Sequence, residues 1–95
     1  DVDRLADLAG ELGLHGVPVF LFQEGADPVA ERAFRQIARL TDGAFCAFDS
    51  SSADQLRDLL SAVAVYAAGG RRALEDFGKS RGGVVPRLVH QVKKD

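Results

Sequence analysis

The chain has little of several residue types, and each shortage excludes a class of protein. It contains one cysteine, Cys46, so no disulfide can form within it and nothing in the sequence requires an oxidising compartment. The longest apolar run, residues 17–22, has the length of a strand and falls far short of the roughly 20 residues that span a bilayer. Nothing at the start resembles a signal peptide. We therefore expect a cytoplasmic protein without a membrane segment.

Composition indicates an ordinary globular chain with an uneven charge. Apolar residues make up 46% of it and charged residues 27%, which argues against disorder. Residues 1–68 hold five basic and eleven acidic side chains, whereas residues 69–95 hold seven and three. A basic end can contact nucleic acid. The tail has no aromatic residue beyond Phe77 and no known module, so we expect a solvated end and no nucleic-acid partner.

Two apolar runs, residues 17–22 and 44–48, flank an amphipathic helix predicted over residues 28–41. Asp27 is a good N-cap, and Pro28 suits the first helical position. Both runs are continuous rather than alternating, as in strands covered on both faces. A crossover of this length requires the strands to run parallel. The sequence therefore predicts an α/β protein: a βαβ unit with flanking helices, part of a doubly wound, Rossmann-like parallel sheet.

Helices are expected on either side of this unit. Leu5, Leu8, Ala9 and Leu12 form one helical face, which Gly13 is expected to close. After the second strand, Ser52 and Gln55 have the spacing of a capping box. A longer apolar stripe then follows at Leu56, Leu59, Leu60, Val63, Ala64 and Ala67. Gly69 and Gly70 should break or bend that helix, with a second piece over 71–79 and a short strand or ragged end over 84–92.

Two strands are too few for a stable sheet. The sequence therefore predicts either an incomplete sheet or one that another copy or a partner completes. The first residue is Asp1 rather than methionine, from which we expect that the chain was excised from a longer one.

The same segment resembles the closing part of von Willebrand factor A-like domains of the bacterial type. Those domains end with a G-V-x-V strand, a helix of pattern L-x-x-I-A-x-x-T-G-G, a strand of aromatic or small residues, and a last helix of pattern L-x-x-L-x-x-x-V. The matching residues are Gly16, Val17, Val19, Phe34, Ile37, Ala38, Thr41, Gly43, Phe45, Leu56 and Leu60. Asp42 departs from the pattern, which has glycine there. The resemblance divides the chain into a half-domain, 1–67, and a helical, basic tail, 68–95.

This resemblance implies a binding role without chemistry. The family's metal site is built from an Asp-x-Ser-x-Ser loop and later residues that would all precede Asp1, so a parent domain would bind Mg²⁺ through upstream residues. Ser50, Ser51 and Ser52 follow the last strand and look like turn and cap residues. We therefore expect no metal ligand, cofactor site or catalytic residue here, and a non-catalytic protein-binding module. The alternatives are an accessory segment of an enzyme or enzyme-assembly subunit, and a stand-alone regulatory dimer.

The candidate partner-binding loop consists of Gln23, Glu24, Gly25 and Asp27. It follows strand 17–22, and ligands of open α/β sheets bind at that end of the strands. The simpler interpretation is that Asp27 caps a helix and Glu24 is solvated.

The remaining candidates are a second surface and three reactive side chains. Strand 17–22 would be an uncovered apolar edge, so a protein partner or self-association is expected there. His15 and His90 are 75 positions apart without convergent carboxylates, and Cys46 lies within an apolar strand. Structural or exposed roles are expected for all three.

Overall fold

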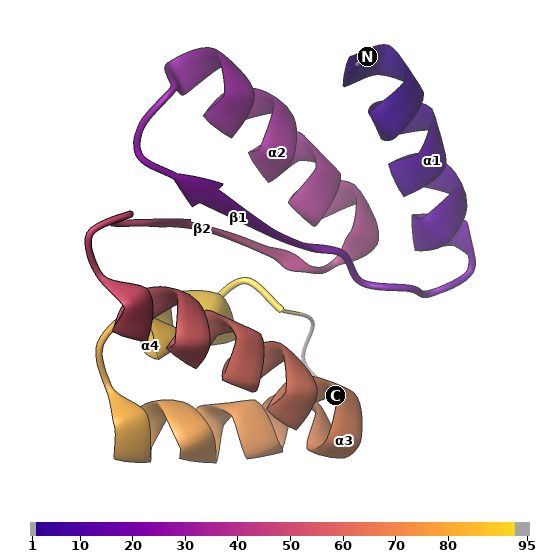
Figure 1. Cartoon of the computed structure of the whole chain (residues 1–95). Coiled ribbons are helices and arrows are strands. Elements are labelled where there is room, and N and C mark those ends of the chain that lie inside the picture. The colour runs from indigo at the N-terminus through magenta and orange to yellow at the C-terminus, as the bar shows by residue number, and fades with distance from the viewer. Residues whose placement is uncertain (1, 93–95) are drawn as a thin grey trace.

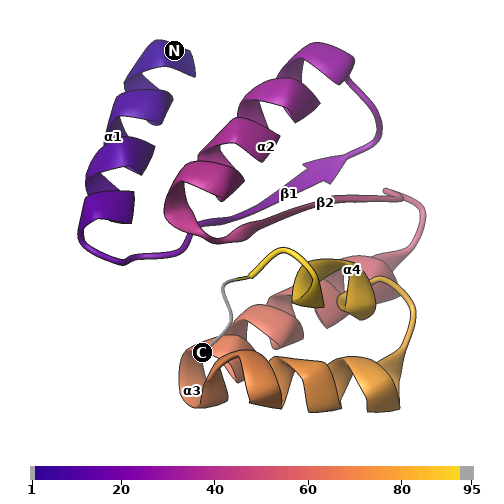
Figure 2. The same ribbon diagram turned by 180° about the vertical axis from the view of Figure 1, so that it is seen from behind.

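The computed structural model describes residues 2–92, which form helices on both sides of a two-stranded parallel sheet. The elements are α1 (Val2–Leu14), β1 (Phe20–Glu24), α2 (Pro28–Thr41), β2 (Ala44–Phe48), α3 (Ala53–Arg81) and α4 (Val85–Val89). Helices α1 and α2 lie on one side of the sheet, and α3 and α4 lie on the other (Figures 1 and 2).

The βαβ unit is confirmed. Strands β1 and β2 pair in parallel from Phe20–Ala44 to Glu24–Phe48, and α2 crosses between them over the predicted residues. Asp27 accepts hydrogen bonds from the N–H groups of Val29 and Ala30, so the predicted cap is present. This order and direction follow from local signals, namely a capped helix between two apolar runs.

The first strand begins and ends later than predicted, at 20–24 rather than 17–22. The N–H of Val19 donates to the side-chain oxygen of Thr41 at 3.0 Å, so the chain is held before the strand pairing begins. At the other end, Glu24 pairs with Phe48. Gln23 and Glu24 are therefore strand residues, not the loop residues that the sequence predicted.

The short connection between α2 and β2 depends on the backbone conformations of Asp42 and Gly43. Asp42 ends α2 in the left-handed conformation at φ 56°. Aspartate tolerates that conformation better than most residues do, so the family's glycine is not required there. Gly43 has a different role, because a Cβ atom on it would lie 1.9 Å from the carbonyl oxygen of Val19.

A second glycine, Gly13, allows α1 to pack against α2. Most of the apolar face of α1 remains exposed. The helix continues through Gly13, so the predicted stop there is wrong. A Cβ on Gly13 would lie 2.3 Å from the carbonyl oxygen of Leu40, so this glycine allows α1 to pack against α2. Of the predicted stripe only Ala9 is buried, and Leu8 is 51% exposed.

Beneath the sheet, α3 and α4 form the main core. Helix α3 bends at Gly70, which has φ 74° and is the only non-helical residue within it, as the glycine pair predicted. Its second half turns back under its first half (Figure 1). The buried core residues are Ala44, Cys46, Leu59, Ala62, Leu74, Val84, Val85, Leu88 and Val92.

The strand considered for residues 84–92 is wrong, because residues 85–89 form a helix. Val85 and Leu88 are fully buried, and Pro86 lies in the first turn of the helix, where its missing N–H would have no partner. The tail therefore packs against the face of the sheet instead of adding a strand to it. The end of the predicted tail, residues 93–95, lies outside the described part of the chain.

Candidate functional site

The predicted loop residues lie at the carboxyl end of β1, but most of them have internal roles. Gln23 is buried, and its side-chain N–H donates to the backbone oxygen of Asp27 at 3.4 Å. Gly25 has φ 75°, and its N–H donates to the Phe48 oxygen at 3.1 Å. Asp27 caps α2. Three of the four candidates thus hold the end of the sheet and the start of α2 together.

Glu24 is the exception. It is exposed, and its carboxylate makes no hydrogen bond or ion pair with any other residue between positions 2 and 92. Since Gln23 and Gly25 hold the backbone on either side, Glu24 presents its charge from a fixed position. Of the four predicted residues, Glu24 is the one that a partner can contact without disturbing the fold.

The neighbouring turn after β2 is also internally bonded. Asp49 accepts from both the N–H and the hydroxyl of Ser51, at 2.9 and 2.8 Å, and these bonds lower the pKa of the Asp49 carboxyl. Ser52 caps α3 by accepting from the Gln55 N–H. The Gln55 side chain in turn accepts from the Asp49 N–H. In an ordinary capping box it would accept from the N–H of the N-cap residue, which is Ser52, three positions later. These residues are turn and cap residues, as the sequence indicated.

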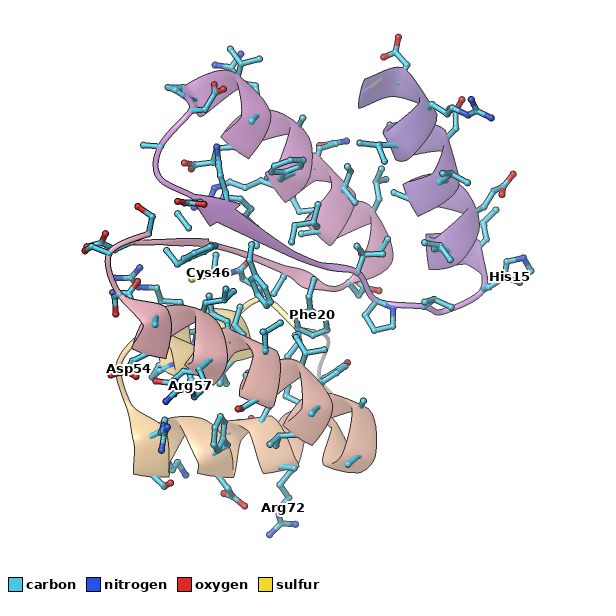
Figure 3. The ribbon with its side chains drawn as sticks, viewed as in Figure 1. His15, Phe20, Cys46, Asp54, Arg57 and Arg72 are labelled. Carbon is cyan, nitrogen blue, oxygen red and sulfur yellow. The ribbon has the colours of Figure 1, made fainter. Side chains whose placement is uncertain are left out.

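No group of three or more histidine, cysteine, aspartate or glutamate side chains in the described chain is arranged to hold a metal ion. His15 lies in the turn after α1, on the outside of the molecule (Figure 3), and His90 follows α4 on the other side of the sheet. Both histidines are exposed. The structure does not bring them together with each other or with Cys46, which is buried.

Cys46 is expected to be a slow nucleophile. Burial raises the pKa of its thiol, although Arg87 and Arg35 partly oppose this shift. The thiolate is the reactive form, so at pH 8 the folded protein should react with iodoacetamide at least about tenfold more slowly than the urea-unfolded protein. The rate should rise with pH as the thiol ionises. Equal rates in the folded and unfolded states would contradict a buried thiol.

A larger surface lies along the outer edge of β1. The Ala44 N–H donates to the Val19 oxygen, and the Gly25 N–H donates to the Phe48 oxygen, so the odd-numbered positions bond to β2. Backbone groups of successive strand residues point to opposite sides, which directs those of Phe20, Phe22 and Glu24 away from β2. Within the described chain, no strand pairs with that edge.

Beside this edge runs an apolar groove of about 610 Å³ between β1 and α3. Phe20 lies on the α3 side of the sheet (Figure 3), where its ring meets Tyr66 edge-on at 5.4 Å. Leu60, in the opposite wall, is 57% exposed. The groove is lined by Pro18, Val19, Phe20, Phe22, Leu60, Val63, Ala64 and Ala67.

The sequence contained a partial signal for this groove. The predicted stripe of α3 divides in the structure: Leu59 is fully buried, whereas Leu60, Ala64 and Ala67 are exposed along the groove. A stripe wider than the core needs indicates a second contact surface. The contribution of Pro18 was missed, because it depends on how β1 and α3 approach each other.

Helix α1 lies on the same side as the open edge. Arg35 and Arg39 line a hollow beside β2 with Gln91, whereas α1 packs at Leu40 through Gly13. Leu40 lies about 140° round α2 from Arg35, so α1 occupies the flank away from β2. Leu5, Leu8 and Leu12 of α1 are exposed.

None of the described helices is long and apolar enough to cross a membrane. Comparisons of the chain with models of known protein families, with curated proteins and with solved structures find no match.

Proposed function

We propose that this chain is a non-catalytic protein-binding module, the closing half of a doubly wound domain similar to von Willebrand factor A domains. One observation carries the proposal. The outer edge of β1 is unpaired within the described chain, and exposed apolar side chains of α3 line a groove beside it.

The open side of β1 has the features of a surface that contacts another protein. An unpaired strand edge invites pairing, and natural proteins normally shorten, charge or cover such edges. Here the only charge on β1 is Glu24, at its last position. A two-stranded sheet gains the neighbours it needs when another strand pairs with β1.

The parent domain would supply that neighbour from its preceding strands. The parallel strands, the helices on both sides and the exposed stripe of α1 support this arrangement. In it, Glu24 stands at the carboxyl edge of the sheet, where open α/β sheets bind ligands. Reading the gene upstream of the Asp1 codon tests the parent: an apolar strand followed by Asp-x-Ser-x-Ser supports it, whereas a start codon directly before Asp1 overturns it.

The division of roles in the loop gives a direct test. Glu24→Ala in the parent domain should weaken partner binding and leave the unfolding temperature nearly unchanged, because its exposed side chain makes no hydrogen bond or ion pair within residues 2–92. Asp27→Ala should lower the free energy of unfolding by about 0.5–2 kcal/mol, as loss of an N-cap does. Thermal unfolding and partner titration of both variants check this. Equal stability losses would refute the division.

The alternative, an accessory segment of an enzyme or enzyme assembly, would use the same open side of β1. The two proposals differ in the activity of the complex that contains this chain, because an accessory segment would belong to a complex that catalyses a reaction. If a complex containing this chain has catalytic activity and Glu24→Ala leaves partner binding unchanged but alters that activity, the accessory role is favoured over the binding module.

A further inference from the structure

The C-terminal segment, residues 71–92, is joined to the rest of the described chain by one bent residue. Helix α3 runs from Ala53 to Arg81, and only Gly70 within it has non-helical angles, at φ 74° and ψ −165°. Beyond Gly70 the helix turns back beneath its own first half and leads into α4 (Figures 1 and 2). The position of the whole C-terminal segment under the sheet therefore depends on the conformation of this residue.

Two adjacent glycines are needed by the bend but not by the helix on either side of it. The angles of Gly70 belong to a region that essentially only glycine adopts. A Cβ on Gly69 would lie 2.6 Å from the Cβ of Ala73. In a straight helix, residues four apart hold their Cβ atoms about 5–6 Å apart, so alanine at position 69 would fit there. Both glycines thus favour the bent form over a straight helix.

The other residues near the bend favour a straight helix. Ala67 and Ala68 precede the glycines, and Arg71, Arg72 and Ala73 follow them, and all five are strong helix formers. A straight helix would also give the backbone groups on both sides of Gly70 the partners that helix ends lack. The bend is therefore stabilised by the contacts that the C-terminal segment makes elsewhere in the chain.

Those contacts lie away from the bend. The buried core residues that the segment supplies are Leu74, Val84, Val85, Leu88 and Val92. Arg81 donates to the Asp58 carboxylate in the first half of α3 at 2.8 Å. The Gln91 side-chain amide accepts from the Phe45 N–H and donates to the Phe45 oxygen, both at 2.8 Å, along β2. Because none of these bonds involves residue 69 or 70, the same segment of another copy would make them equally well.

We propose that a second copy of this chain binds by exchange: α3 straightens at Gly70, and residues 71–92 of each copy pack beneath the sheet of the other. Exchange of an identical element is a low-cost route to a dimer, because each contact of the monomer is made again between chains. The bent monomer and the exchanged dimer then differ at residues 69–70 and in the entropy of association. The inference does not rest on the proposed binding role, because exchange leaves the β1 edge of each copy unpaired.

Replacement of the two glycines tests the proposal. Gly69→Ala and Gly70→Ala should each disfavour the bent form and favour the straight helix. In analytical ultracentrifugation of the 95-residue chain, each should lower the dimer dissociation constant at least about tenfold. Gly10→Ala makes the same change in α1, where the added methyl meets nothing within 4 Å, and should leave this constant unchanged. Folded variants at positions 69 and 70 that stay monomeric would overturn the proposal.

The ion pair between Arg81 and Asp58 identifies an exchanged dimer. Asp58→Arg and Arg81→Asp are made in separate chains that both carry Gly70→Ala. Positions 58 and 81 then carry like charges within each chain and in a dimer of identical copies, whereas an exchanged dimer of the two different chains has opposite charges at both pairs. After mixing in urea and refolding, native mass spectrometry should show the mixed dimer at least about fivefold over either like dimer, against about twofold for random pairing. Random pairing would mean that the copies associate through another surface, such as the β1 edge, and would refute exchange.

The chain with both glycines intact decides the matter if the alanine variants do not fold. Unfolded in urea and refolded over a range of protein concentrations, it should form a dimer whose fraction rises with concentration. The two charge-reversed chains with Gly70 retained should again pair preferentially with each other. Refolding to monomers alone at every concentration, or random pairing of the reversed chains, would overturn the proposal.

Discussion

Gly43→Ala is expected to destabilise the protein by about 3 kcal/mol or more, because the added methyl has nowhere to go. A Cβ at this position would lie 1.9 Å from the oxygen and 2.6 Å from the nitrogen of Val19. Both neighbours are backbone atoms, so no side-chain rotation relieves the contact. Separating them would break the bond between the Ala44 N–H and the Val19 oxygen, which begins the sheet.

Gly10→Ala is the matched control. Gly10 lies within α1, and a methyl group added there would have nothing within 4 Å, so alanine should raise stability by roughly 0.5–1 kcal/mol through helix propensity. Urea unfolding of the two variants, followed by circular dichroism, measures both effects. If Gly43→Ala unfolds at the same urea concentration as the unmodified chain, the close approach of residues 19 and 43 is wrong.

Features of the fold that follow from neighbouring residues could be predicted from the sequence. Asp27 and Pro28 fixed the start of α2, and the second strand, 44–48, has the predicted bounds. The bend at Gly70 was likewise expected. Each depends on a cap, a continuous apolar run or a glycine within a few residues, which is information that the chain carries locally.

Features that depend on distant contacts could not be predicted. The start of β1 is set by Thr41, 22 residues after Val19. Gly13 has the sequence pattern of a helix stop, but its role is to let α1 approach Leu40. Gln91 reaches Phe45 across 46 residues. Such pairs have no sequence spacing of their own, because they arise only when the elements have packed.

The candidate site also contains residues whose roles could be predicted from local sequence and residues whose roles could not. Asp27 was predictable as a cap, and the simpler interpretation of the loop also indicated that Glu24 is solvated. The burial of Gln23 was not predictable, because it required the strand to extend past residue 22. The only sequence signal for the groove beside β1 was the apolar stripe of α3, which is wider than packing against the core requires.

Leu59→Ala is expected to cost about 2–5 kcal/mol, the usual range for emptying a buried leucine site. Leu59 is fully buried in the core formed by α3, α4 and β2. Its side chain cannot be replaced by water at low cost, and the surrounding residues can close the cavity only in part. Chemical unfolding of the 95-residue chain measures the loss.

Leu60→Ala is the control for that loss and also a test of the open surface. Leu60 is the next residue of α3, but it is 57% exposed in the groove. A surface substitution of this kind should change stability by about 0.5 kcal/mol or less, since alanine favours the helix and little burial is lost. A loss at Leu60 equal to that at Leu59 would mean that the groove is covered in the isolated chain, and the surface proposed for protein binding would then not be free.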